Sequence, residues 1–120
     1  MRQFAKASFV VLALLCGTPA SAADYSAPLS PQQEDFKARF LARDEICRKQ
    51  AIERYGVPEE QAEAFCVCEI DVIARNSNLK DLASFTKAAI GTKQEQAENA
   101  ARAQFLTDQL KTERKRVCGY

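Results

Sequence analysis

Two cysteines separated by a single residue, Cys66 and Cys68, lie inside a stretch with a strongly helical composition. Each residue of an α-helix turns the chain by about 100°, so residues i and i+2 point about 200° apart. Two such sulfur atoms cannot bond to each other or share one metal ion while the helix is intact. Each cysteine therefore needs its own partner, and the pair predicts a helix that is joined to neighbours on two sides.

The N-terminal segment has the pattern of a cleaved secretory signal peptide, and we predict that residues 1–23 are removed on export. Positive charge comes first, an apolar run follows, and small residues provide a cleavage position after Ala22 or Ala23. The apolar run, residues 9–15, is shorter than the about 20 residues that a membrane-spanning helix needs. No second run of this kind follows, so we predict a periplasmic or secreted protein without a transmembrane anchor.

A lipoprotein is the alternative interpretation of the leader, because Cys16 follows two leucines. A cysteine that receives a lipid normally follows a small residue, and Leu15 is not small. We therefore expect export without lipidation at Cys16.

Removal of the leader leaves an even number of cysteines, which in a short exported chain is typical of a disulfide framework. A chain of this length forms one domain with a modest core, which crosslinks stabilise. We predict a flexible lead-in at 24–30, followed by a single helical domain at 31–120. The cysteines of the predicted framework are Cys47, Cys66, Cys68 and Cys118.

The charge balance and the absence of histidine exclude several classes of function. The full chain has 17 basic and 16 acidic side chains, and the leader holds two of the basic ones and no acid, so 15 and 16 remain. This balance gives no reason to expect nucleic acid as a partner. Without histidine there is no Ser-His or Cys-His catalysis and no His-ligated zinc. We predict that the protein is not an enzyme and needs no cofactor.

Start and stop signals predict four helices and no strands, which is an all-α bundle of orthogonal or up-down type. Capping boxes open the first and the last helix, at Ser30 with Gln33 and at Thr92 with Glu95. The predicted spans are 31–55, 58–75, 79–90 and 93–117. Each helix contains at least one phenylalanine, which predicts one shared core: Phe36 and Phe40, Phe65, Phe85, and Phe105.

Height along the helices predicts which cysteines pair. The short turn at 56–57 folds the first two helices into an antiparallel hairpin. Cys47 and Cys66 each lie nine residues from this turn, so they meet at one height and we predict that they bond to each other. Cys68 then pairs with Cys118. The swapped pairing, Cys47–Cys68 with Cys66–Cys118, stays open.

The length of the fourth predicted helix conflicts with a simple up-down arrangement. If the third helix ran antiparallel to the second, the longer fourth helix would overshoot and carry Cys118 away from Cys68. We therefore expect either that the third helix lies across the bundle or that the fourth is bent or frayed.

Two sets of residues are candidates for a functional site. Cys66 and Cys68 would act as a redox pair or a soft-metal site only with exposed, converging thiolates, which an oxidising compartment disfavours. A basic run near the end of the chain is typical of a helix C-terminus, where cations are favoured. The alternative is a docking patch for an acidic partner or for anionic headgroups, formed by Lys111, Arg114, Lys115 and Arg116.

The order of the cysteines resembles that of a known group of proteins. An early lone cysteine, Phe-Cys-Val-Cys in a helix, a polar stretch with Leu-Lys-Asp-Leu and a late cysteine resemble the small exported all-helical, disulfide-containing proteins of Gram-negative bacteria. That group includes periplasmic immunity proteins and small chaperones.

From these observations we expect a non-catalytic domain that binds another periplasmic or secreted protein, as an inhibitor, immunity factor, chaperone or assembly accessory. The alternative from a different class is a thiol-based redox or soft-metal-handling module that uses Cys66 and Cys68.

Overall fold

The computed structural model describes residues 23–120, and this part of the chain folds into helices without any strand. The predicted all-α fold with two disulfide crosslinks is confirmed. The predicted leader, with Cys16, lies outside the described residues except for Ala23. Six α-helices and one 3₁₀ turn follow one another: α2 (Pro31–Leu41), α3 (Asp44–Tyr55), η3 (Glu59–Gln61), α4 (Ala62–Asn76), α5 (Leu79–Ile90), α6 (Lys93–Gln109) and α7 (Lys111–Cys118).

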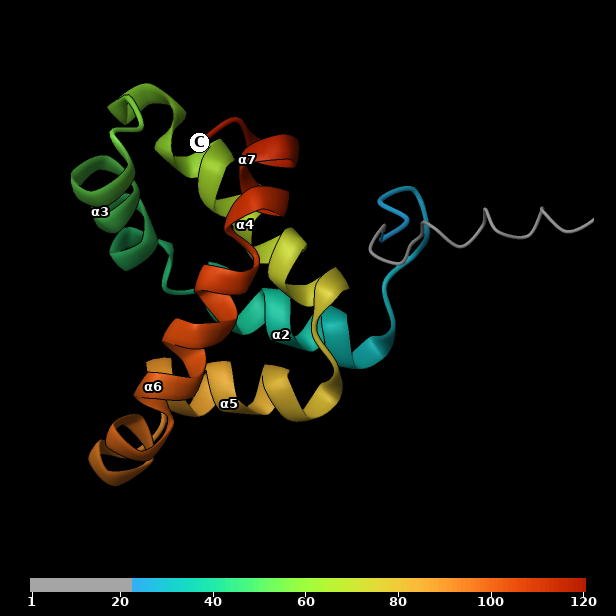
Figure 1. Cartoon of the computed structure of the whole chain (residues 1–120), viewed down its shortest axis with the longest axis vertical. Helices are drawn as coiled ribbons and strands as arrows, with labels where there is room; N and C mark the ends of the chain where they lie inside the picture. Colours follow the sequence, from blue (N-terminus) through green and yellow to red (C-terminus); the bar gives the residue numbers. More distant parts are fainter. Residues whose placement is uncertain (1–22) are drawn as a thin grey trace, which may run out of the picture.

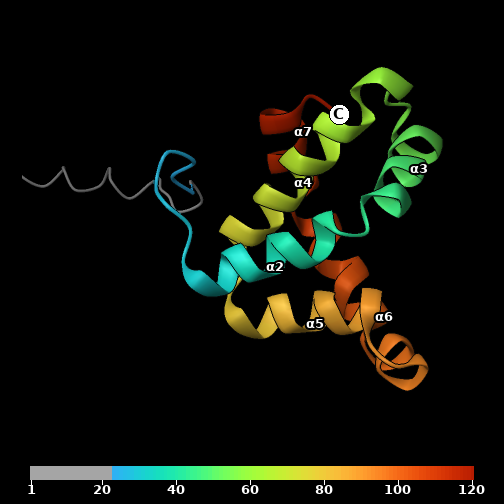
Figure 2. The same ribbon diagram turned by 180° about the vertical axis from the view of Figure 1, so that it is seen from behind.

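Helix α4 is the centre of the molecule, and α2, α3 and α7 all pack against it. Figures 1 and 2 show α3 on one side of α4 and α7 on the other, with α2 and α5 side by side near its far end. Helix α6 packs on α5 and leads the chain back to α7. The helices cross one another instead of sharing one axis, which places the chain end beside the start of α4 (Figure 1).

Local residues set several helix boundaries, as predicted. The side chain of Ser30 accepts a hydrogen bond from the Gln33 N–H, and the Gln33 side chain accepts one from the Ser30 N–H. Thr92 and Glu95 form the same capping box at the start of α6. Gly56 ends α3 with a φ of 68°, in the left-handed region that favours glycine.

The first predicted helix, 31–55, is wrong as a single element, because the chain breaks at Ala42 and Arg43. Arg43 has φ −125° and ψ 35°, outside the helical region. Before the break, Phe36 packs in one cluster of buried side chains, and after it Ala51 packs in another. A straight helix would point both residues in one direction, so the break lets each segment face its own cluster.

The fourth predicted helix, 93–117, is also wrong as a single element, because it bends at Leu110, where φ is −90° and ψ is 3°. The Leu110 N–H is shared between the carbonyl groups of the residues three and four positions earlier, at 3.2 and 3.1 Å. Such shared bonds are common where helices end. The bend turns α7 against α4 and carries Cys118 to Cys68, so the expectation of a bent final helix is confirmed.

The buried side chains form two clusters, and the prediction of one shared core is wrong. Helix α4 contributes to both clusters. Phe65 belongs to the second, whereas Phe105 is 49% exposed and belongs to neither. The first cluster contains Phe36, Ile70, Ala74, Leu82, Phe85 and Leu106, and the second contains Ala51, Val57, Ala62, Phe65 and Cys66.

The two disulfides fasten α4 on both sides. Cys47–Cys66 joins α3 to α4 with a Cα–Cα distance of 6.0 Å, and Cys68–Cys118 joins α4 to α7 with a distance of 5.8 Å. Both distances lie in the usual range for disulfides. The predicted pairing is confirmed, the swapped pairing is excluded, and the adjacent cysteines of α4 have separate partners.

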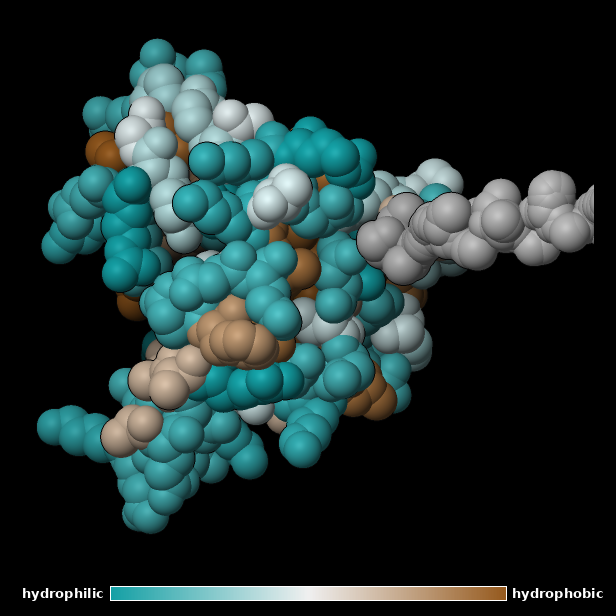
Figure 3. Space-filling model, in the orientation of Figure 1, coloured by the Kyte–Doolittle hydropathy of each residue, from teal (hydrophilic) through white to brown (hydrophobic). Residues whose placement is uncertain are grey.

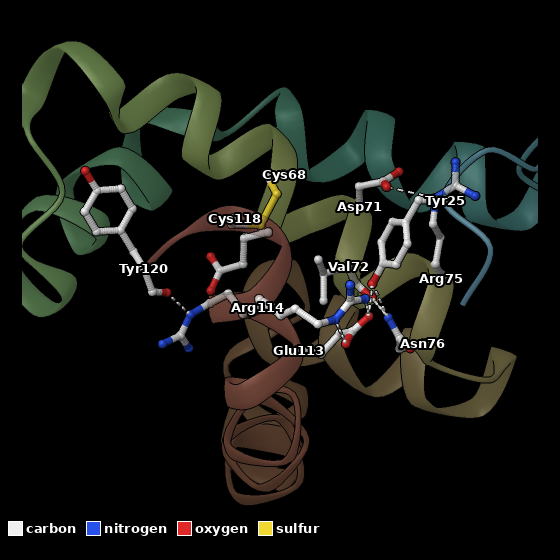
Figure 4. Close-up of a disulfide and its surroundings, with 12 residues drawn as sticks. Tyr25, Cys68, Asp71, Val72, Arg75, Asn76, Glu113, Arg114, Cys118 and Tyr120 are labelled. Atoms are coloured by element: carbon white, nitrogen blue, oxygen red, sulfur yellow. Dashed lines mark hydrogen bonds and ion pairs between the residues drawn. A yellow bond between two sulfur atoms is a disulfide. The ribbon is translucent and has the colours of Figure 1, made fainter. Parts of the chain in front are cut away.

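Residues 24–30, predicted as a flexible lead-in, pack against α4 and α7 (Figure 4). The Tyr25 hydroxyl donates to Oε2 of Glu113 at 2.7 Å and accepts from Nδ2 of Asn76 at 3.0 Å. The Arg75 guanidinium donates to two backbone carbonyl groups of the lead-in, at 2.9 and 2.8 Å. These contacts join residues far apart in the sequence, so composition alone did not predict them.

The surface and the disulfides indicate the environment in which this fold is stable. Among residues 23–120, no helix is long and apolar enough to span a membrane. The face in Figure 3 is mostly hydrophilic, and its apolar side chains form small, separate groups. Two disulfides are consistent with an oxidising compartment outside the cytoplasm.

Candidate binding groove

A groove of about 630 Å³ opens where the end of α3, the end of α6 and α7 meet. Helix α7 reaches this position because of the bend at Leu110, and the Cys68–Cys118 disulfide holds it there. Basic and aromatic side chains make up most of the lining. They are Arg54 and Tyr55 from α3, Lys111, Arg114 and Lys115 from α7, and Tyr120.

Arg114 forms the floor of the groove and is only 6% exposed. Its guanidinium carbon lies 4.2 Å from the centroid of the Tyr55 ring, which is a cation–π contact. Its Nε donates to a main-chain oxygen of Tyr120 at 2.7 Å (Figure 4). An arginine held in this way is always charged and keeps one position, so the floor carries a fixed positive charge.

The two tyrosines of the groove are held by the second cluster. The ring centroid of Phe65 lies 5.7 Å from that of Tyr55 and 5.9 Å from that of Tyr120. The Tyr120 hydroxyl donates to Oε1 of Gln61 at 2.6 Å. Burial raises the pKa of Tyr55, and the nearby Glu69 carboxylate raises it further. The Tyr55 phenol is therefore a neutral donor at neutral pH.

Glu69 lies on α4 among the residues that support the floor. Its Oε1 is 3.8 Å from Sγ of Cys47, and it forms no ion pair within the described part of the chain. Burial raises the pKa of its carboxyl group, and the charge of Arg114 opposes this effect in part. The ionised carboxylate is thus destabilising in this position compared with the neutral acid.

Three exposed cations form the rim of the groove: Arg54, Lys111 and Lys115. None of them forms an ion pair with another of the residues that the structure describes. Asp108 is the one acid of the lining, and it accepts a hydrogen bond from Gln104. With the floor arginine, four cationic side chains face one acidic side chain, and a concave surface concentrates the field of such a cluster.

Helix stability accounts for some of these cations but not for Lys111. Lys115 and Arg116 lie in the last turn of α7, where the helix dipole favours positive charge. Lys111 is the first residue of the same helix, where a cation is disfavoured by about 0.3–1 kcal/mol. The bend at Leu110 creates this helix start, so the interpretation of the basic run as a helix C-terminus covers only its second half.

The four residues predicted as a docking patch do not form one surface. Lys111 and Lys115 flank the groove, Arg114 is buried beneath them, and Arg116 lies outside the lining, paired with an acid one turn earlier. Arg54 of α3 joins the groove and was missed. Only tertiary packing brings Arg54 to α7, and no sequence spacing indicates it.

Cys66 and Cys68, the residues of the redox or metal alternative, are each bonded to a different cysteine. Cys66 is fully buried. In residues 23–120, no group of three or more His, Cys, Asp or Glu side chains could hold a metal ion. Use of the two sulfur atoms as thiolates would first require both disulfides to open.

A second groove, of about 310 Å³, lies between α2 and α5. Its wall is largely apolar and includes Phe36 and Leu82, with Leu79 58% exposed. Two of its charged residues, Asp35 and Arg39, pair with each other at 2.9 Å. Because these charges neutralise one another, this groove has a weaker electrostatic character than the basic groove.

Comparisons of the chain with models of protein families, with characterised proteins and with solved structures found no match. A function has to be argued from the geometry of the chain itself, and the basic groove is its most distinctive feature.

Proposed function

We propose that this chain is a non-catalytic exported domain that binds another protein in the periplasm or outside the cell. The observation that supports this is the basic groove, in which three exposed cations surround a fixed floor of Arg114 and Tyr55 and form no ion pair with any side chain of residues 23–120. Charges left unpaired around a concave surface are complemented by a partner of opposite charge. The binding would serve inhibition, immunity, chaperoning or assembly.

The crosslinks support a binding role, because they fix the walls of the groove before a partner arrives. The disulfide Cys47–Cys66 ties α3 to α4, and Cys68–Cys118 ties α7 to the same helix. The groove lies between these two walls. A preformed groove loses little conformational entropy on binding, so more of the contact energy contributes to affinity.

Affinity capture with the tagged, oxidised chain tests the proposal. We expect the exported fraction of the native cells to yield one partner protein in near-stoichiometric amount. The matched control is the same chain after reduction and alkylation of its cysteines, which removes the crosslinks without changing the charged side chains. Recovery of no partner by the oxidised form contradicts the proposal. Recovery of the same partner by both forms would show that binding does not need the crosslinks.

A further inference from the structure

We infer that the partner protein enters the basic groove through an acidic segment of its own chain, whose carboxylates pair with Lys111, Lys115 and Arg54. This inference rests on the proposed function and specifies the chemistry of the partner. Two observations support it: the positions of the three rim cations, and the burial and contacts of Arg114 between them.

The rim cations lie on two walls and are spaced for more than one anion. Lys111 and Lys115 are four residues apart on α7, so their Cβ atoms lie about 5–6 Å apart on one face of the helix. Arg54 belongs to the last turn of α3, on another wall. In an extended chain, side chains on one face recur every about 7 Å. Acidic residues at alternate positions of such a segment therefore match the spacing of the two lysines.

A phosphate group fits the groove less well than separate carboxylates. Phosphate is held best by converging donors, above all by the fork of an arginine. Arg114 offers little of this fork to a ligand, because it is only 6% exposed, its Nε is bonded to Tyr120 and its face lies on the ring of Tyr55. The remaining cations are divided between α7, which carries the two lysines, and α3, which carries Arg54, so they do not converge on one point. An acidic protein segment is therefore favoured over a phosphate or a lipid headgroup.

The aromatic residues provide the rest of the contact surface. Tyr55 and Tyr120 are half-buried and line the groove between the charged walls. The neutral phenol of Tyr55 is a hydrogen-bond donor for a carboxylate or a backbone carbonyl group. Amphipathic rings of this kind add contact area at low entropic cost.

NMR titration of the oxidised chain with a synthetic peptide of alternating glutamate and serine tests the inference, because it detects weak binding residue by residue. We expect chemical-shift changes confined to the groove, at Lys111, Lys115, Arg54 and the two tyrosines. Because salt screens charge interactions, the affinity for the peptide should fall as salt is added. A peptide of alternating lysine and serine should cause none. Absence of shifts with the acidic peptide, or shifts elsewhere on the surface, overturns the inference.

A charge-reversal variant with a matched control gives the second measurement. Lys111→Glu with Lys115→Glu removes two attractions and adds two repulsions, so the affinity for the acidic peptide should fall roughly tenfold to a hundredfold. The control reverses Lys80 and Lys93, two exposed lysines outside the groove, and should bind as the native chain does. Circular dichroism checks that both variants fold. Equal affinities of the two variants contradict the inference.

Two further experiments distinguish an acidic segment from other anionic ligands, and distinguish this inference from the proposed function. If inorganic phosphate or vesicles that contain phosphatidylglycerol cause the same shifts at lower concentration than the peptide, the ligand is a phosphate or a lipid surface and the inference is wrong. If the partner captured by the native chain is retained equally by the Lys111→Glu, Lys115→Glu variant, the proposed function stands and only the acidic segment is excluded.

Discussion

Glu69 is a carboxyl group on the central helix that the fold only partly accommodates. It has Sγ of Cys47 at 3.8 Å and the charge of Arg114 nearby, but no ion pair among the described residues. Burial therefore raises the pKa of this group above its ordinary value of 4.5. The folded chain holds the proton more tightly than the unfolded chain does, so the stability from protonated Glu69 is lost as the pH rises above 4.5 and through the raised pKa.

The variant Glu69→Gln should be more stable than the native chain at neutral pH, because it replaces a partly buried charge with a neutral group of similar shape. We expect the midpoint of thermal unfolding to rise by a few degrees at neutral pH, and the gain to shrink as the pH falls toward 4.5. Differential scanning calorimetry over this pH range measures both effects. Glu53→Gln, at an exposed position of α3, is the control and should cause neither. A gain that does not depend on pH contradicts this account.

Tyr25 is the residue that fastens the lead-in, and its hydroxyl both donates to Glu113 and accepts from Asn76. Burial and the bond to Glu113 raise its pKa to about 12. Tyr25→Phe removes both bonds and leaves the ring, so the free energy of unfolding should fall by about 1 kcal/mol. Limited proteolysis should then cut within 24–30 faster than in the native chain. An unchanged cleavage rate would show that Arg75 alone holds the segment.

Single residues could be predicted from the sequence where their role is local. The capping pairs at Ser30 and Thr92 act over three residues, and the structure confirms them. Arg114 has the same charge as its neighbours, and only the bend at Leu110 turns it inward onto Tyr55. Its burial was missed because it depends on how α7 packs against distant elements.

At the scale of elements, the sequence predicts the helices that lie between strong signals but not the positions of the breaks inside them. The length of the last helix led us to expect a bend there, whereas nothing indicated the break at Arg43. Helix α5 lies between the Asn78 cap and Gly91 and agrees with the prediction. The breaks at Arg43 and Leu110 have no proline or glycine to mark them. They exist because the two halves of each predicted helix pack in different places: α2 and α3 contribute to different buried clusters, and α6 packs on α5 whereas α7 packs on α4. Periodicity within one segment does not contain this information.

The two disulfides should stabilise different helices, α3 for Cys47–Cys66 and α7 for Cys68–Cys118. The Cys68–Cys118 bond closes a separation of 50 residues and the Cys47–Cys66 bond one of 19, for which the chain-entropy model gives about 4 and about 3 kcal/mol. We expect Cys68→Ala with Cys118→Ala to lower the urea midpoint and to increase hydrogen exchange first in α7. Cys47→Ala with Cys66→Ala should loosen α3 instead, and it also removes the buried sulfur of Cys66. Identical exchange patterns in the two variants would show that α3 and α7 unfold together.

At the scale of the whole molecule, the net charge does not show how the charged side chains are distributed over the surface. The balance of 15 basic and 16 acidic side chains after the leader gave no reason to expect nucleic acid as a partner. The fold nevertheless gathers Arg54 and the cations of α7 around one groove with a single acid. A net charge says nothing about where the charges lie. The groove could be found only once the bend at Leu110 had brought Arg114 of α7 to Tyr55 at the end of α3.

The whole fold should depend on oxidation, because neither cluster of buried side chains is large and α4 is held to its neighbours by sulfur on two sides. The two crosslinks together account for about 7 kcal/mol in the chain-entropy model, against a typical stability of about 5–15 kcal/mol. Reduction should therefore remove most of the helical circular dichroism signal at 37 °C, a temperature at which small domains without their disulfides often fail to fold. Thiol counting on the native chain should give none, whereas two reactive thiols at Cys66 and Cys68 would support the redox or metal alternative. A reduced chain that keeps its helices would show that the two clusters are sufficient, and the crosslinks would then serve to fix the groove.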